Sequence, residues 1–256
     1  MDQDLINYGQ QNFTLPHDIV PLPSGGIFYK SRKKAIKVGY LTASDENILA
    51  NMDGRKSINE AIVIPLLRSK IYEPDIRPEE LLEGDVEAIL LFLRNTSFGP
   101  EYNVVTTDPK TKQSFETSIM LDELNINKSK VEPNEDGFYS VKLPMSGSNV
   151  KLRILSLMDT IAIDNIVDKY PKGYAAPIVT TRLSKMIVEV DGNTDQGEIA
   201  LFCQNMPIGD SKFIRKFMKE NEPRLDLNRS VIAPSGEKVD VTIAFGVEFF
   251  RPFFAV

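Results

Sequence analysis

The sequence has little of what most catalytic and metal sites need. It contains one cysteine (Cys203), one histidine (His17) and no tryptophan among 256 residues. One thiol and one imidazole are too few for a zinc site, which takes three or four such ligands. They also leave His17 as the only imidazole that could activate a nucleophile, and Cys203 without a disulfide partner in the chain. We therefore expect no catalytic residue and no bound metal.

Motifs for binding cofactors are missing as well. The doublet Gly25-Gly26 lacks the other glycines of a dinucleotide fingerprint, and no GxxxxGK[ST] phosphate loop occurs. A sharp turn after Pro23 explains the doublet more simply. Most carboxylates lie where they can cap helices or form turns, and no close pair indicates glycosidase chemistry. The sequence predicts a protein that is not an enzyme and has no cofactor.

Long hydrophobic runs and an excess of positive charge are also absent. The most apolar stretches, Ile62–Leu67 and Ala88–Leu93, are far shorter than the roughly 20 residues that cross a bilayer. The first residues do not resemble a secretory signal. A formal net charge of −6 argues against broad binding to nucleic acid or an anionic membrane. We expect a protein kept in a reducing cytoplasm, or in a particle assembled there.

Two parts of the sequence resemble each other, which indicates an internal duplication; the alternative is that any α+β chain contains strands, helices and hairpins in some order. Residues 22–45 read LPSGGIFYKSRKKAIKVGYLTASD, and residues 143–159 read LPMSGSNVKLRILSLMD. Both segments begin with Leu-Pro, continue with Ser-Gly and an alternating apolar stretch, and end on an aspartate. These aspartates, Asp45 and Asp159, are 114 residues apart, and the apolar stretches keep the same offset.

A second matched block follows at another offset. Gly84-Asp85 corresponds to Gly209-Asp210, and an offset of 125 residues continues through a helical segment and a hairpin to Thr117 and Thr242. The extra residues fall between the two blocks, in loops, where insertions cost little. We interpret the chain as a diverged pair of repeats, and predict that the two halves superpose.

The pattern predicts an α+β fold in which each half has a short β element, several helices and a ribbon-like β-hairpin. Asp45 and Ser57 mark helix starts, and Pro65 predicts a kink or an end in the second helix. Turn-forming residues divide the expected hairpins at residues 102–119 and 229–243. The predicted segments are an N-terminal arm (1–20), a first repeat (21–124), a linker or insert (125–142) and a second repeat with a phenylalanine-rich tail (143–256).

Phenylalanines crowd this C-terminal tail. They cannot all point into one core from one strand, and Pro252 interrupts any strand there. Some can pack back on the second hairpin, and those left over would form an exposed apolar patch, which is typical of an interface. We therefore predict a partner-binding role for Phe249, Phe250, Phe253 and Phe254.

Two smaller features allow simpler explanations. The basic run Lys30–Lys34 fits a solvated turn, with contact to a phosphate or an acidic partner as the alternative. Cys203 stands beside Phe202 on a predicted helix, which favours a small buried thiol over a reactive one.

The whole pattern resembles the baseplate hub assembly proteins of T-even-type contractile-tailed bacteriophages. The resemblance runs from about residue 20 nearly to the end, and the order of the pieces carries it more than any single one. These pieces are Leu22–Tyr29, Ile36–Leu49, Gly99–Tyr102, Leu121–Leu124, Met206–Ser211 and Phe245–Pro252.

The resemblance implies a structural or assembly role in a tail baseplate hub, with other baseplate or tail proteins as partners. It implies a location in the host cytoplasm during assembly, and it leaves open whether the protein stays in the virion tail or leaves as a chaperone. Relatives with Cys-x-x-Cys knuckles in their hairpins resemble small zinc ribbons. Because the turns at Asp108 and Ala233 have no cysteine here, no metal is carried over.

An alternative from another class is a nucleic-acid-binding module with metal-free ribbon hairpins. The acidic balance and the lack of an aromatic–basic stripe speak against it.

Overall fold

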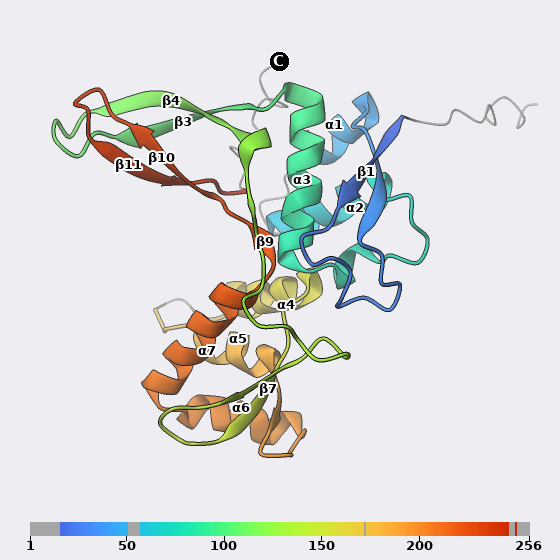
Figure 1. Cartoon of the computed structure of the whole chain (residues 1–256), viewed down its shortest axis with the longest axis vertical. Coiled ribbons are helices and arrows are strands. Elements are labelled where there is room, and N and C mark those ends of the chain that lie inside the picture. The colour runs from blue at the N-terminus through green and yellow to red at the C-terminus, as the bar shows by residue number, and fades with distance from the viewer. Residues whose placement is uncertain (1–15, 51–56, 172, 246–248, 250–256) are drawn as a thin grey trace, which may run out of the picture.

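The fold is α+β, which confirms the predicted class: helices and small antiparallel sheets build an elongated molecule (Figure 1). The computed structural model describes residues 16–50, 57–171, 173–245 and 249. The elements as far as the second hairpin strand are β1 (His17–Pro21), β2 (Ala35–Gly39), α1 (Ala43–Ala50), the π-helical η1 (Asn59–Val63), α2 (Ile64–Lys70), the 3-10 turn η2 (Pro78–Glu80), α3 (Glu83–Phe98), β3 (Glu101–Thr107) and β4 (Ser114–Met120).

The remaining elements are η3 (Leu121–Glu123), β5 (Ile126–Asn127), β6 (Tyr139–Lys142), β7 (Asn149–Leu152), α4 (Leu157–Asp168), α5 (Ile178–Met186), β8 (Ile187–Val190), α6 (Gln196–Asn205), α7 (Ile208–Asn221), β9 (Arg224–Leu225), β10 (Asn228–Ile232) and β11 (Lys238–Thr242).

The two halves repeat the same order of elements. Strands β2 and β7 begin 114 residues apart, and so do helices α1 and α4. Helices α3 and α7 begin 125 residues apart, and each leads toward an antiparallel hairpin. Strand register repeats too, because Val20 pairs with Ile36 in the first half and Val141 with Val150 in the second. The matched segments therefore share secondary structure, and the superposition of the two halves stays a prediction.

A buried aspartate joins the matched blocks inside each half. In the first half, the Asp85 carboxylate accepts hydrogen bonds from the backbone N–H (2.9 Å) and the hydroxyl (2.6 Å) of Ser24. In the second, Asp210 accepts from the backbone N–H groups of Met145 (2.8 Å) and Ser146 (2.9 Å). The start of α3 or α7 therefore holds the Leu-Pro-Ser-Gly loop of its own half.

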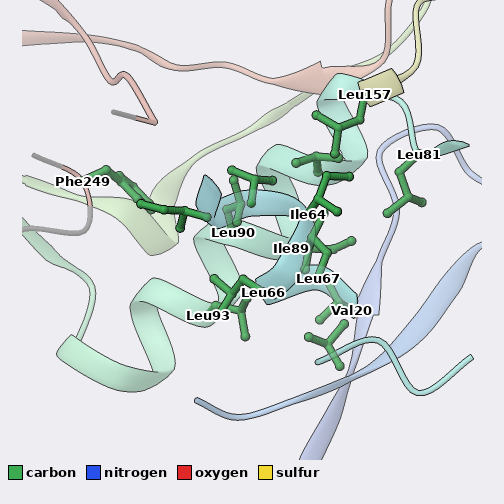
Figure 2. Close-up of a cluster of buried hydrophobic side chains, with 14 of the residues drawn as sticks. Val20, Ile64, Leu66, Leu67, Leu81, Ile89, Leu90, Leu93, Leu157 and Phe249 are labelled. Carbon is green, nitrogen blue, oxygen red and sulfur yellow. The ribbon is translucent and has the colours of Figure 1, made fainter. Parts of the chain in front are cut away.

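Buried apolar side chains form two clusters. The first core surrounds α2 and α3 and includes β1, β2 and the hairpin β3–β4 (Figure 2). The second core lies between the sheet β6–β7–β8 and helices α4 to α7. The hairpin β10–β11 belongs by sequence to the second half, yet Val231 and Ile243 around it pack into the first core. The division in space therefore differs from the division in sequence.

The structure differs from the sequence-based boundaries at three points. Strand β1 begins at His17, inside the predicted arm, and β6 lies inside the predicted linker. Pro65 does not end its helix: the helical backbone continues through it, and the hydrogen bonding changes from the π-helical η1 to α2 just before it. A local change of helix type of this kind is a known way for a helix to accommodate a proline, which lacks the N–H for an i→i−4 bond.

The two cores meet at a seam with close backbone contacts. Strands β5 and β9 pair between them, and the backbone N–H of Leu157 donates to the carbonyl of Leu81 at 2.8 Å. Gly84 leaves no room for a larger side chain, because a Cβ atom there would lie 2.2 Å from the carbonyl oxygen of Pro223. Arg224 forms an ion pair with Glu87 of α3 across the same seam.

Candidate interaction surface

The two hairpins together form an arm, β3–β4 with β10–β11, that projects from the body of the molecule with both turns at the same end (Figure 1). Each strand alternates between covered and exposed residues. The covered side chains of both hairpins belong to the first core, so each hairpin has one face against the other. This follows from the two-residue period of a strand, which places alternate side chains on opposite faces.

The ends of the arm are held together by Asp108. Its carboxylate accepts hydrogen bonds from the hydroxyl (2.8 Å) and backbone N–H (3.0 Å) of Ser235 in the other hairpin. It also accepts from the backbone N–H groups of Lys110 and Thr111 in its own turn. Burial disfavours the charged carboxylate, but these hydrogen bonds outweigh it and hold the pKa of Asp108 below its ordinary value.

The base of the arm is fixed to α3 by Arg94. This buried guanidinium donates to the carbonyl oxygens of Gly99 (2.8 Å) and Glu101 (3.2 Å), where the chain leaves the helix for β3. It also stacks over the ring of Phe98, 5.2 Å from the centroid. The arm is therefore attached to the core by polar contacts as well as by packing.

The outer faces of the arm present large apolar side chains to solvent. Val105 on β3 is 69% exposed and Ile232 on β10 is 60% exposed. Neither side chain fills the inner face of the arm, because Val104 and Val231 occupy that face and pack into the core. Neither residue was predicted as a site from the sequence, although a signal exists: each is apolar and directly follows an apolar residue that points inward.

The phenylalanine-rich tail is described only in part. Phe249 is fully buried in the first core, where its ring lies 4.6 Å from Phe245 and 5.8 Å from Tyr102 between centroids (Figure 2). In this fold it serves the core and presents no surface to a partner. Phe250, Phe253 and Phe254 lie outside the described residues.

The remaining residues singled out in the sequence have structural roles. Cys203 is buried in the second core, and burial raises its thiol pKa to about 11. His17 makes an edge contact with Tyr72. In the basic run, Lys33 pairs with Glu73 and Asp75, and Arg32 donates to backbone carbonyls. Lys33 and Arg32 therefore fix a turn instead of forming a free basic patch.

The described part of the chain has neither a cluster of metal ligands nor a membrane-spanning helix. Among these residues, no three His, Cys, Asp or Glu side chains are grouped so that they could hold a metal ion. Likewise, no helix in the part that the structure describes is long and apolar enough to cross a membrane.

The features above define an α+β protein with two cores and an arm of two paired hairpins that presents apolar side chains to solvent. The chain belongs to the T4 bacteriophage base plate protein family, whose model matches residues 26–251. No curated protein and no solved structure matches the chain. Membership indicates a structural or assembly role in a phage tail baseplate, in association with other baseplate proteins.

Proposed function

We propose that the protein is a non-enzymatic component of the baseplate hub, and that it acts through protein contacts made by the hairpin arm. The observation that carries this proposal is the pair of exposed residues on the arm, Val105 and Ile232. Exposed apolar side chains on a rigid projecting element are a common basis of protein interfaces. The arm is rigid because Asp108 joins its turns and Arg94 fixes its base.

A double substitution tests this role of the arm. Val105→Lys places a cation opposite Glu116, and Ile232→Glu places an anion opposite Lys238, so each new charge faces an opposite one across the hairpin. We expect an unchanged melting temperature and a strong loss of complete baseplates, counted by electron microscopy of particles made with the variant.

The matched control changes two apolar residues that are exposed on the body instead of the arm. Ile19→Glu faces Lys37 across β1–β2, and Leu201→Lys lies on α6; the wild-type side chains are 68% and 54% exposed. This control should assemble normally. A lowered melting temperature in the arm variant, or normal assembly, would refute the proposed contact.

The position and permanence of the protein need a separate measurement. Mass spectrometry of purified tails should find the chain at a fixed copy number, and a small tag on it should appear at the central axis of the baseplate. Absence from the tails would instead identify a transient assembly chaperone, and a peripheral tag would place the protein outside the hub.

The tail carries a second proposed contact. We expect Phe253→Ser combined with Phe254→Ser to leave the isolated protein folded but unable to join its assembly, as measured by thermal melts and particle composition. A collapsed melting temperature would show that this pair belongs to the core. Normal melting with normal assembly would show that the pair has neither role.

A further inference from the structure

The exposed face of α7 carries an array of positive charge. Its solvent-facing side chains are Lys212, Arg215, Lys216, Lys219 and Glu220, which are spaced three and four residues apart. Like charges at this spacing destabilise a helix by a few tenths of a kcal/mol per pair. Only the Lys216–Glu220 pair offsets this along the described helix, at 4.0 Å. The array therefore weakens the helix on which it stands.

The same face of α3 is covered. At the offset of 125, Leu90 and Leu91 of α3 correspond to Arg215 and Lys216 of α7, and both leucines belong to the first core or pack against it. An extended segment, Pro223 through β9, lies along α3 and contacts the start of that helix. The fold thus already shows how an extended chain docks on this helix within the repeat.

One charge differs in sign between the two helices at the point where β9 contacts α3. In the first half, Glu87 of α3 pairs with Arg224 of the docked segment. Lys212 stands at the equivalent position of α7. A segment that docks on α7 in the same way would therefore meet a cation where β9 meets a carboxylate.

A groove runs beside this face. It has a volume of about 620 Å³ and lies between α7 and the chain that follows β5. Its lining is Ile126, Asn127, Lys128, Lys130, Lys216, Lys219 and Glu220. Glu220 pairs with Lys130 and Lys216, whereas Lys128 and Lys219 have no ion pair among the residues that the structure describes. Two unpaired cations thus face the groove.

We propose that this groove and the exposed face of α7 bind an extended, carboxylate-rich segment of a partner protein. The proposal is independent of the hairpin arm. A protein segment fits better than a nucleic acid, because Glu220 stands among the cations and Ile126 offers an apolar contact.

The test measures binding of a fluorescein-labelled peptide of ten glutamates to the full chain by fluorescence anisotropy at low ionic strength. The variant Lys128→Gln with Lys219→Gln removes the two unpaired cations of the groove. We expect it to bind roughly 3- to 30-fold more weakly, because each exposed ion pair contributes modestly. Added salt should weaken binding to the wild-type protein.

A control and two further outcomes complete the test. Lys110→Gln with Lys112→Gln removes the same charge from the β3–β4 turn, where both lysines are exposed, and should bind the peptide as the wild type does. The groove variant should melt no lower than the wild type, since Lys219 is repelled by Arg215 and Lys216. Equal weakening in both variants, or no measurable binding, would overturn the proposal. Tighter, groove-dependent binding of a ten-nucleotide oligothymidine would overturn it as well and identify a nucleic-acid site.

The arm variant Val105→Lys with Ile232→Glu separates this proposal from the hub proposal. It should keep full binding of the glutamate peptide even where it fails to assemble. Loss of peptide binding in that variant would show that the two surfaces are not independent, and would overturn this part of the inference.

Discussion

Helices α3 and α7 carry the same Gly-Asp pair in their first turn, and each holds the same kind of loop. They differ in how much of their surface is buried. Half of the residues of α3 are buried, by the first core on one side and by β9 on another, and only Thr96 and Ser97 are exposed. Helix α7 buries one stripe and exposes a basic face. Two helices at equivalent positions of the sequence thus have different roles: α3 is a central core helix, and α7 is a core helix on one side and a surface on the other.

The largest expected effect tests whether the two cores are separate. Phe249→Ala should cost about 3–5 kcal/mol in urea denaturation, because a fully buried ring is removed from the first core. Hydrogen exchange should then increase in α3 and β3 more than in β6 and β7. Equal loss of protection in both regions would show that the cores unfold as one unit. Leu201→Ala, at an exposed position of α6, should stay within about 0.5 kcal/mol.

The seam between the halves predicts a pH dependence. Burial and the nearby Glu83 raise the pKa of Glu222 from 4.5 to about 7. Because the folded pKa exceeds the unfolded one, this group's contribution is fully present below pH 4.5 and is lost as the pH rises through 7. Glu222→Gln should therefore stabilise the protein by up to about 3 kcal/mol at pH 8 and have little effect at pH 4. A stability difference that does not change with pH would contradict this.

The paired glycines give a smaller and more direct comparison. In Gly84→Ala the new Cβ would meet the backbone of Pro223 and Arg224, so we expect a loss of about 1–3 kcal/mol. In Gly209→Ala the obstacle is the Met145 side chain, which can turn away, and alanine favours the helix. The second variant should stay within about 1 kcal/mol of the wild type in the same denaturation assay. Equal losses would show that the two helix starts are equally confined.

The smallest effect concerns the two equivalent aspartates. Deep burial raises the pKa of Asp85, despite the hydrogen bonds from Ser24 and Tyr29. Burial also acts on Asp210, but under a single loop the hydrogen bonds from Met145 and Ser146 outweigh it, and its pKa is lowered. The wild type should therefore lose stability at Asp85 and gain it at Asp210 as the pH rises through the range of carboxyl titration.

Substitution by asparagine should reveal these opposite trends. The destabilisation by Asp85→Asn should shrink as the pH rises from 3 to 7, whereas that by Asp210→Asn should grow, both followed by thermal melts at several pH values. Parallel trends would show that the two carboxylates share one environment and would contradict the comparison.

The sequence predicted the elements of the repeat but not their arrangement. The offsets of 114 and 125 located matching strands and helix starts, because strand register, capping and turn residues are local. Strand β1 was missed since only Val20 of its five residues is buried, which leaves no alternating pattern. The hairpin β10–β11 packs into the first core, and Phe249 is buried there. Both facts depend on contacts between residues far apart in the sequence, which no local pattern encodes.

The path of the chain also has a consequence for synthesis on the ribosome. The first core is begun by residues before Asn125 and completed by Val231, Ile243 and Phe249, after the whole second core has been made. At 5–20 residues per second, the roughly 120 intervening residues take roughly 6–24 s to translate. For that time the apolar face of the β3–β4 hairpin has no partner in the nascent chain. The amino-terminal repeat is thus the first to be synthesised and the last to be finished.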